Sequence, residues 1–389
     1  MNTYLIVGTY PPRKCGIASF SHDLRSNLLP YGHQVLMAAI SDPFSSYVYP
    51  PEVAFTIRQE RQADYADCAH WANHNPAVGM VIIQHEYGIF GGQDGDYVLA
   101  LISNLQKPYL LVTHTVLPHP HEHQQQVLSK AAHPAAGIIC MTSRARKILT
   151  DVYSVPSNKI FMVPHGVPNF PVKDRELLKV QYGLADRRII TTFGFVGPGK
   201  GLEFGLKSLA LIKDKYPEAL YIIAGKTHPM LMKNEGERYR NSILELVSRL
   251  HLEDNVFFIN RFLDDDEMGD CLYLTDIYLS PYPNLDQAVS GPLSFAVGCG
   301  KAIIATPYAY AQEILAEGRG LIARDTTPEA IAEQLDLVLG NPAVQTRLEK
   351  KAAELGRSFA WKNVAGVYQQ IAKEVIEDND VGERQRFGL

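Results

Sequence analysis

The stretch Tyr4-Leu5-Ile6-Val7-Gly8 and the segment that follows it decide the fold class of this 389-residue chain. The apolar run predicts a buried strand, and Pro11-Pro12 ends it. Apolar residues then recur at spacings of three and four, which places them on one face of a helix: Ile17, Phe20, Leu24 and Leu28. A strand that leads into an amphipathic helix is typical of a parallel sheet covered by helices.

The same alternation continues along the chain and is interrupted once. Short apolar runs predict further strands at 35–40, 80–83, 109–113 and 137–141. Prolines and charges break the pattern near 167–186, and a second series of strands is predicted at 188–195, 220–224, 256–259, 277–279 and 302–306. We therefore predict an α/β chain with two Rossmann-like domains, 1–170 and 171–358. Ligands of such sheets bind beyond the carboxyl ends of the strands, so we expect a site in a cleft between the domains.

Composition and charge exclude several classes of protein. With 46% hydrophobic and 10% aromatic residues the chain is expected to fold, not to be disordered. The 37 Lys and Arg against 42 Asp and Glu give a net charge of −5, so no overall basic field attracts nucleic acid. Five cysteines without a C-x-x-C pair indicate reduced thiols. The absence of a signal-like start and of an apolar run near ~20 residues predicts a cytoplasmic protein without a transmembrane segment.

The string Gly194-Phe195-Val196-Gly197-Pro198-Gly199-Lys200-Gly201 follows the first predicted strand of the second half. It fits G-x-x-x-x-G-K but has glycine where a nucleotide hydrolase needs Ser or Thr for magnesium. Backbone N–H groups, a helix N-terminus and the Lys200 ammonium suit a diphosphate, and Gly199 belongs to this loop. A purely structural turn is the alternative.

Three loops of the first half carry candidate residues after predicted strands. Gly16 would let a ligand approach the backbone, although a solvated loop with a capping glycine is the alternative. No G-x-G-x-x-G is present, which argues against a nicotinamide dehydrogenase. The loops 84–92 and 113–115 concentrate polar and aromatic residues where active-site loops belong. His114 could hydrogen-bond a sugar, or it could be only a packed histidine.

Two further segments carry polar side chains. His119, His121 and His123 alternate in a Pro-containing stretch without a second ligand cluster, so we predict a solvated loop and no metal site. The segment 280–292 leads into a predicted helix, where the N–H groups of Ser290 and Gly291 could meet sugar hydroxyls or phosphate. Gln287 would add an amide, and a structural turn is again the alternative.

Taken together, these strings resemble glycosyltransferase family 4. They occur in the family's order over nearly the whole chain: Gly16 before a helix, Gly32-His33-Gln34-Val35, Thr113-His114-Thr115, Val163-Pro164-His165-Gly166-Val167, 193–201, Ile223-Ala224-Gly225 and 300–306. The resemblance implies the GT-B fold, two Rossmann-like domains whose parallel sheets face a cleft. Phe359-Ala360-Trp361 is similar to the family's closing segment and implies a helix over 359–376 that crosses back to the first domain. The polar stretch 377–389 predicts a frayed tail.

The resemblance implies a retaining, metal-independent transferase that needs no cofactor and moves a hexose of glucose or mannose type. The donor would be a UDP- or GDP-sugar, and the acceptor would be a hydroxyl of a glycan, glycolipid or small molecule. Peripheral contact of the protein with a membrane is compatible with such acceptors. Lys200 matches the lysine that neutralises the leaving diphosphate, Gly16 the glycine near the donor, and His114 the histidine beside the donor sugar. We expect Glu86 and Tyr87 to hold the acceptor on the first domain.

Three positions depart from the family pattern. Phe195 stands where members carry an arginine, and Gln287 and Phe295 stand where they carry two glutamates eight positions apart. Arg261 is predicted as a substitute cation for the donor. Two alternatives stay open: a GT-B sugar-nucleotide epimerase or hydrolase, and a sugar-nucleotide-binding protein without catalysis.

Overall fold

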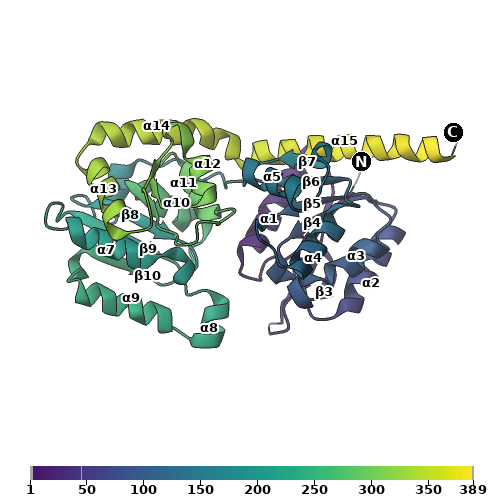
Figure 1. Cartoon of the computed structure of the whole chain (residues 1–389), viewed down its shortest axis with the longest axis horizontal. Helices are drawn as coiled ribbons and strands as arrows, with labels where there is room; N and C mark the ends of the chain where they lie inside the picture. The colour runs from purple at the N-terminus through teal and green to yellow at the C-terminus, as the bar shows by residue number, and fades with distance from the viewer. Residues whose placement is uncertain (1–2, 45, 388–389) are drawn as a thin grey trace. The chain divides into compact units, whose positions relative to one another are not determined.

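The protein is built from two compact Rossmann-like units. The computed structural model describes the backbone of residues 3–44 and 46–387, and the side chains in these ranges except those of 230 and 378–387. One unit comprises Met1–Gly166 with Trp361–Leu389, and the other comprises Val167–Ala360. Each contains one parallel sheet with helices packed against it (Figure 1). The predicted fold class is confirmed.

The first unit contains a seven-stranded parallel sheet in the order β3-β2-β1-β4-β5-β6-β7. Its strands are β1 (Thr3–Gly8), β2 (Val35–Ser41), β3 (Val53–Arg58), β4 (Val78–His85), β5 (Tyr109–Thr113), β6 (Gly137–Cys140) and β7 (Ile160–Met162). The order reverses beside β1, between β2 and β4. Because all strands run parallel, their carboxyl ends meet at one edge, and the loops after β1, β4 and β5 are brought together there.

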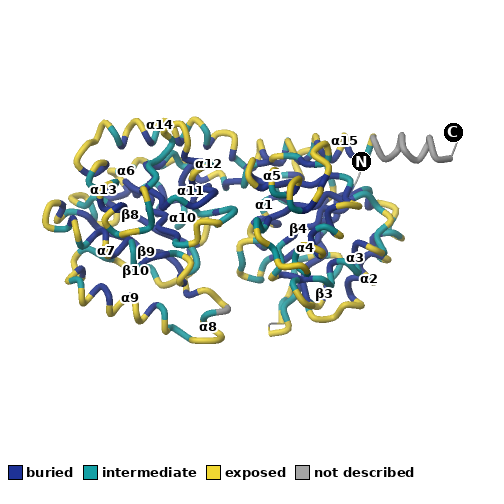
Figure 2. The backbone as a smooth tube through the Cα atoms, in the orientation of Figure 1, coloured by how far each residue is buried: buried dark blue, intermediate teal, exposed yellow. Residues whose placement is uncertain are grey.

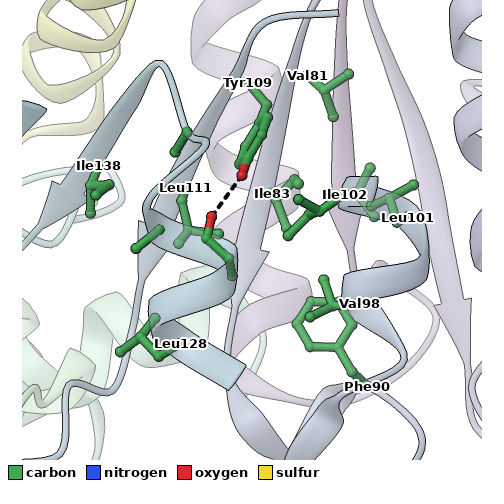
Figure 3. Close-up of a cluster of buried hydrophobic side chains, with 14 of the residues drawn as sticks. Val81, Ile83, Phe90, Val98, Leu101, Ile102, Tyr109, Leu111, Leu128 and Ile138 are labelled. Carbon is green, nitrogen blue, oxygen red and sulfur yellow. Dashed lines mark hydrogen bonds between the residues drawn. The ribbon is translucent and has the colours of Figure 1, made fainter. Parts of the chain in front are cut away.

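Helices pack against this sheet and bury its apolar side chains. They are α1 (Gly16–Leu28), α2 (Gln62–His74), α3 (Val98–Asn104), α4 (Glu122–Ala132), α5 (Ser143–Asp151) and α15 (Trp361–Phe387). The predicted face of α1 is confirmed, since Phe20, Leu24 and Leu28 are buried and Ile17 packs against the core. In the core shown in Figure 3, Ile83 of β4 and Leu111 of β5 lie among side chains of α3 and α4. Burying each large side chain of this kind contributes about 1.5–3 kcal/mol.

The second unit contains a six-stranded parallel sheet in the order β10-β9-β8-β11-β12-β13. Its strands are β8 (Arg188–Phe193), β9 (Ala219–Ala224), β10 (Val256–Ile259), β11 (Ile277–Ser280), β12 (Ala302–Ala305) and β13 (Leu321–Ile322). Successive residues of β8 face opposite sides of the sheet, so Ile190 belongs to one buried cluster and Ile189 to the other.

The helices of the second unit are more numerous. They are α6 (Arg175–Gln181), α7 (Leu202–Ile212), α8 (Pro229–Glu235), α9 (Arg238–Arg249), α10 (Asp265–Leu274), α11 (Gly291–Gly298), α12 (Ala309–Ile314), α13 (Pro328–Leu339) and α14 (Pro342–Phe359). Short 3-10 turns complete both units: η1 (Leu29–Tyr31), η2 (Tyr87–Ile89), η3 (Gln93–Gly95), η4 (Ser157–Lys159), η5 (Pro198–Lys200), η6 (Glu253–Asn255) and η7 (Ala316–Gly318). Strands β8 and β11 are neighbours, which places the loops after them side by side.

The chain passes from the first unit to the second after Gly166 and returns at Trp361, and the residues at both points are closely packed. Val167 N–H donates to the Phe359 carbonyl at 2.7 Å inside the second unit. In the first unit a Cβ on Gly166 would lie 2.2 Å from the Trp361 ring, so only glycine fits there. Helix α15 packs along α1, and the Trp361 indole donates to Asp23 at 3.1 Å. Of the tail predicted at 377–389, the side chains from 378 on and residues 388–389 lie outside the described residues.

Burial follows the two sheets. Most strands are buried along most of their length, whereas β3, β10, β13 and the outward faces of the helices are more exposed (Figure 2). Among the described residues, no helix has the length and apolar character to cross a membrane. The five cysteines, all of them described, form no disulfide.

Candidate functional site

The loop after β8 makes a tight turn at the carboxyl edge of the second sheet. Gly194 has φ +113° and Gly201 has φ +60°, a backbone region that favours glycine. A Cβ on Gly201 would lie 2.0 Å from the Pro281 carbonyl oxygen, so this loop and the loop after β11 touch through backbone atoms. Lys200 ends η5 between these glycines, half-buried.

A chain of hydrogen bonds links Lys200 to the start of α11. Lys200 Nζ donates to the Tyr282 hydroxyl at 2.7 Å, and this hydroxyl lies 3.2 Å from Ser290 Oγ. Ser290 Oγ accepts the Leu293 N–H at 3.2 Å and so caps the helix. The structure thus brings together Lys200 and Ser290, 90 positions apart, through a tyrosine between them.

The start of α11 offers a donor to an anion. Ser290 takes the Leu293 N–H, and Pro292 has none to give. No acceptor among the described residues takes the Gly291 N–H. Because the N-terminus of a helix carries a partial positive charge, this N–H and the nearby Lys200 cluster favour a phosphate group.

The Lys200 charge acts on its neighbours. Burial by itself raises the pKa of Tyr282, but the adjacent Lys200 charge and hydrogen bonds outweigh it, so that the pKa lies below its ordinary value. Burial and, after it, the Lys200 charge lower the pKa of His228. The field around Lys200 is therefore positive.

Two candidate glycines have no structural need to be glycine. Neither Gly16 nor Gly199 has a positive φ, and a Cβ on either would meet nothing within 4 Å. Gly16 begins α1 at the carboxyl edge of the first sheet, and Gly199 lies exposed in η5 beside Lys200. Open space at a loop glycine leaves room for a ligand to approach the backbone.

Two predicted donor-binding residues have other partners. The Gln287 amide donates to the Val289 carbonyl at 2.9 Å and so closes its own loop. Arg261 follows β10, two strands from β8, and forms an exposed ion pair with Glu267. Neither forms a hydrogen bond or an ion pair with Lys200, Tyr282 or Ser290 among the described side chains.

His114 is buried at the carboxyl edge of the first sheet. Its Nε2 lies 2.7 Å from Gln84 Oε1, and its ring packs edge-on against Phe20 with the centroids 4.7 Å apart. Burial, followed by the neighbouring His165 and His85, lowers the pKa of His114 to about 3. The ring is therefore neutral at physiological pH.

The loop after β4 holds a carboxylate and two aromatic rings. Glu86 accepts a hydrogen bond from the Thr115 hydroxyl at 2.6 Å, and burial raises the pKa of Glu86. Tyr87 packs edge-on against His85 with the centroids 5.0 Å apart. Neither ring nitrogen of His85 has a hydrogen-bond partner among the described residues, and burial lowers the pKa of His85 to about 4. Glu86, Tyr87 and His114 thus lie along the ends of neighbouring strands.

The alternating histidines lie at the start of α4. The His121 ring accepts the Gln124 N–H and caps this helix, and the His123 ring lies 2.8 Å from Asp94 Oδ2. Among the described residues, no group of three or more His, Cys, Asp or Glu side chains could hold a metal ion. The prediction of a loop through His123 is wrong at its end, because α4 already begins at Glu122 and His123 belongs to this helix.

Comparison with known families decides the identity of the second unit. Residues 174–355 match the family described as Glycosyl transferases group 1. The second unit is a glycosyltransferase group 1 domain. A curated relative, the D-inositol 3-phosphate glycosyltransferase of Kineococcus radiotolerans, is 24% identical over 273 residues, which cover 66% of this chain and 60% of that protein. The alignment thus spans less than two thirds of the relative's length.

Solved structures extend the likeness in fold to both units. Sucrose-phosphate synthase from Thermosynechococcus elongatus superposes with a TM-score of 0.78 at 18% identity, covering 97% of this chain and all of that one (100%). HepE from Anabaena, solved in complex with UDP-glucose, superposes with a TM-score of 0.72 at 14% identity, covering 96% of this chain and 99% of that one. The two Rossmann-like units therefore have the GT-B fold of glycosyltransferases.

Two phenylalanines of the glycosyltransferase domain are packed as apolar residues. Phe295 of α11 stacks on Phe193 with the centroids 6.1 Å apart and meets Phe170 edge-on. Phe195 packs against His228 and Phe262. Rings packed in this way cannot accept hydrogen bonds from ribose or hexose hydroxyls.

Sequence reasoning did not single out the partners of the two central side chains. Tyr282 holds Lys200, and Gln84 holds His114. Both partners lie at strand ends, where Gln84 is within β4 and Tyr282 is two residues after β11. Their position at carboxyl ends of strands was the signal that could have found them.

Proposed function

We propose that the protein is a retaining, metal-independent glycosyltransferase that moves a hexose from a UDP- or GDP-sugar to a hydroxyl acceptor. The observation that carries the proposal is the cluster of Lys200, Tyr282 and Ser290 at the carboxyl edge of a glycosyltransferase group 1 domain. HepE has the same fold and was solved in complex with UDP-glucose, which supports a sugar nucleotide as donor.

The Lys200 cluster would stabilise the leaving diphosphate. An ammonium has three N–H donors, and Tyr282 takes one, which leaves two for phosphate oxygens. The Gly291 N–H adds a donor at the positive end of α11. Each well-placed donor to charge that develops in the transition state is worth about 3–4 kcal/mol. Metal-independent departure of the nucleotide is thus chemically reasonable.

Transfer with retention needs attack on the face from which the diphosphate leaves. The acceptor oxygen forms a bond to the anomeric carbon while the bond from that carbon to the phosphate oxygen breaks. The proton of the acceptor hydroxyl passes to the departing diphosphate oxygen. This route requires no protein base between donor and acceptor.

The first unit would supply neutral and weakly acidic groups to the sugars. Gln84 Oε1 only accepts hydrogen bonds, so His114 Nε2 donates to it, and Nδ1 is left as an acceptor for a sugar hydroxyl. Glu86 and Tyr87 would hold the acceptor, which we propose is a glycan, glycolipid or small molecule in the cytoplasm. Because its pKa is about 3, His114 is not an imidazolium acid at neutral pH, and we assign it a binding role as a neutral ring.

The test is a turnover assay with the full chain. UDP-glucose, UDP-N-acetylglucosamine and GDP-mannose are each incubated with EDTA, with and without a panel of hydroxyl acceptors. We expect nucleotide release that depends on the acceptor, and a product whose anomeric proton coupling in NMR shows retention. Equal release without acceptor would indicate a hydrolase or epimerase. Saturable binding without release of nucleotide would indicate a binding protein, and either result contradicts the proposal.

A further inference from the structure

A cavity of about 430 Å³ opens at the amino-terminal edge of the second sheet. Arg188 begins β8, Glu218 precedes β9 and Asp276 precedes β11, and all three line the cavity. The Lys200 loop follows the other end of β8, and a strand of six residues spans about 20 Å. The cavity is therefore separate from the proposed donor site.

Four cations and two carboxylates lie close together on the inner wall of this cavity. Asp276 is 3% exposed and lies 2.8 Å from Lys179 Nζ, 3.5 Å from an Arg175 nitrogen and 4.0 Å from Arg188 Nε. Glu349 pairs with Arg175 at 2.5 Å, and Arg187 adds a fourth cation. Two inner carboxylates thus face four positive charges.

The remaining carboxylates lie farther out or are only partly buried. Glu176 and Asp186 are exposed at the rim, where a Glu176 carboxylate oxygen lies 3.6 Å from Lys179 Nζ, and Glu218 is half-buried. Solvent screens rim charges much more than buried ones. The four cations of the lining thus stand against five carboxylates, of which solvent screens the two exposed ones most, and these two provide hydrogen-bond acceptors at the rim.

The three arginines have donor capacity that the protein does not use. Arg188 donates through one terminal nitrogen to Gln345 at 2.6 Å, and Arg187 donates to the Asp254 carbonyl at 2.5 Å. The buried Nε–H groups of Arg175, Arg187 and Arg188 have no acceptor among the described residues. Unsatisfied buried donors are uncommon, and these three belong to arginines that line the cavity, so each side chain would have to rotate to turn its Nε–H toward a ligand.

The buried lysine Lys301 interacts electrostatically with charged residues of this wall. Lys301 is 3% exposed and donates to the carbonyls of Tyr273 and Thr275. Burial and, after it, the Arg175 charge lower the pKa of Lys301 to about 8. Glu349 and Asp276 act on this pKa in the opposite direction, and an anion in the cavity would add to their effect.

We infer that this cavity is a second ligand site, which binds a phosphate-bearing small molecule. Arginine forks match phosphate geometry, and the exposed Glu176 and Asp186 at the rim can accept hydroxyl hydrogen bonds from a sugar or polyol that carries the phosphate. The site takes residues from α6, β8 and α14. Helix α6 lies near the start of the second unit and α14 near its end, and the Val167 N–H donates to the Phe359 carbonyl at the end of α14. A ligand in the cavity would therefore contact both of these segments.

The test is isothermal titration of the full chain with inorganic phosphate and with glucose 6-phosphate at low ionic strength. We expect saturable binding of both, tighter for the sugar phosphate. Lys200→Ala removes the ammonium of the donor site and should retain saturable binding at the cavity, so that failure of the proposed donor site and failure of this inference are distinguishable. Absence of saturable binding of both probes overturns the inference.

Substitutions of arginines and of a carboxylate in the cavity should change the affinity for phosphate in opposite directions. Arg187→Gln and Arg188→Gln should each weaken binding about tenfold, as the loss of one charged hydrogen bond requires. Glu349→Gln should strengthen it, because Arg175 loses its competing carboxylate. The matched control is Arg324→Gln, an exposed arginine of the same unit that does not line the cavity. Equal affinity of the Arg324 and Arg188 variants, with both folded by circular dichroism, overturns the inference.

Discussion

Lys200 is held by Tyr282 in two ways, since its Nζ donates to the hydroxyl at 2.7 Å and lies 4.7 Å from the centroid of the same ring. The tyrosine is itself fixed, because it is buried and its hydroxyl lies 3.2 Å from Ser290 Oγ. A flexible lysine thus has a defined position before any ligand arrives. Preorganised charge of this kind is the form in which electrostatic stabilisation contributes most to catalysis.

Removing the ammonium should abolish most of the transfer activity. Lys200→Ala is expected to lower kcat at least ~100-fold, because one donor to the leaving diphosphate is lost. The matched control is Lys207→Ala, which removes an exposed lysine from α7 in the same unit. Initial rates of nucleotide release measure both, and a Lys200→Ala enzyme as active as the Lys207→Ala enzyme would refute the assigned role.

Removing only the hydroxyl that positions Lys200 should have a smaller effect. Tyr282→Phe keeps the ring and the Ser290 cap but deletes one hydrogen bond to the ammonium. A hydrogen bond is worth about 1 kcal/mol, so we expect roughly a fivefold loss of kcat/KM for the donor. Steady-state kinetics at varied donor concentration tests this, and a loss as large as that of Lys200→Ala would show that the hydroxyl itself takes part in the chemistry.

Replacement by alanine should have different effects at two glycines of the same loop. Gly201→Ala is expected to lower stability by more than about 2 kcal/mol, because φ is +60° and the Cβ would lie 2.0 Å from the Pro281 oxygen. Gly199→Ala should leave the melting temperature unchanged, since its Cβ meets nothing within 4 Å, and should weaken donor binding. Calorimetry measures the stabilities, and titration with UDP measures the affinity. Unchanged donor affinity in Gly199→Ala would remove Gly199 from the site.

The central strands of both sheets and the edge strand β10 are predicted from sequence, but the edge strands β3, β7 and β13 are not. Strand β3 alternates exposed and partly buried residues, and β13 has only two residues, so neither forms a run of buried apolar side chains. Helix α6 is missed for a related reason. Leu177 and Val180 are 72% and 64% exposed, so its apolar residues do not form one buried face. Elements at the surface lack the burial that creates periodic patterns.

The glycine loop with Lys200 is a local signal, whereas its environment is not. Tyr282 reaches Lys200 because β8 and β11 are neighbours in the sheet, and that neighbourhood follows from the crossover order of the strands. The phosphate-site cavity is less visible still, since Arg188, Asp276 and Glu349 come from three distant segments. Each is an ordinary charged residue in its own stretch of sequence, and only the sheet edge brings them together.

Neutralising Glu86 should stabilise the first unit and impair transfer. Burial raises the pKa of Glu86 in the folded protein. The protonated Glu86 side chain therefore stabilises the folded state at acid pH, and this stabilisation is lost as pH rises through the folded pKa. Glu86→Gln therefore should unfold at higher urea concentration than the wild type at pH 7, with a smaller difference at pH 4.5. Both tryptophans, Trp71 and Trp361, belong to the first unit, so their fluorescence reports its unfolding. Exposed Glu60→Gln is the control, and equal midpoints for all three proteins at pH 7 would contradict the buried charge.

His114 should make the first unit less stable in acid. Its folded pKa is about 3 against an ordinary value of 6.5, so between these values the unfolded chain binds a proton that the folded chain does not. Stability attributable to this residue therefore falls as pH drops below 6.5, by of order 3 kcal/mol at pH 4.5. His114→Gln keeps a hydrogen-bonding side chain but cannot take up the proton, so its urea midpoint should fall less between pH 7 and pH 4.5. His74→Gln, which changes an exposed histidine of α2, is the matched control. If the two variants lose stability in parallel with the wild type, His114 is protonated in the folded protein and cannot serve as the neutral sugar-binding group proposed here.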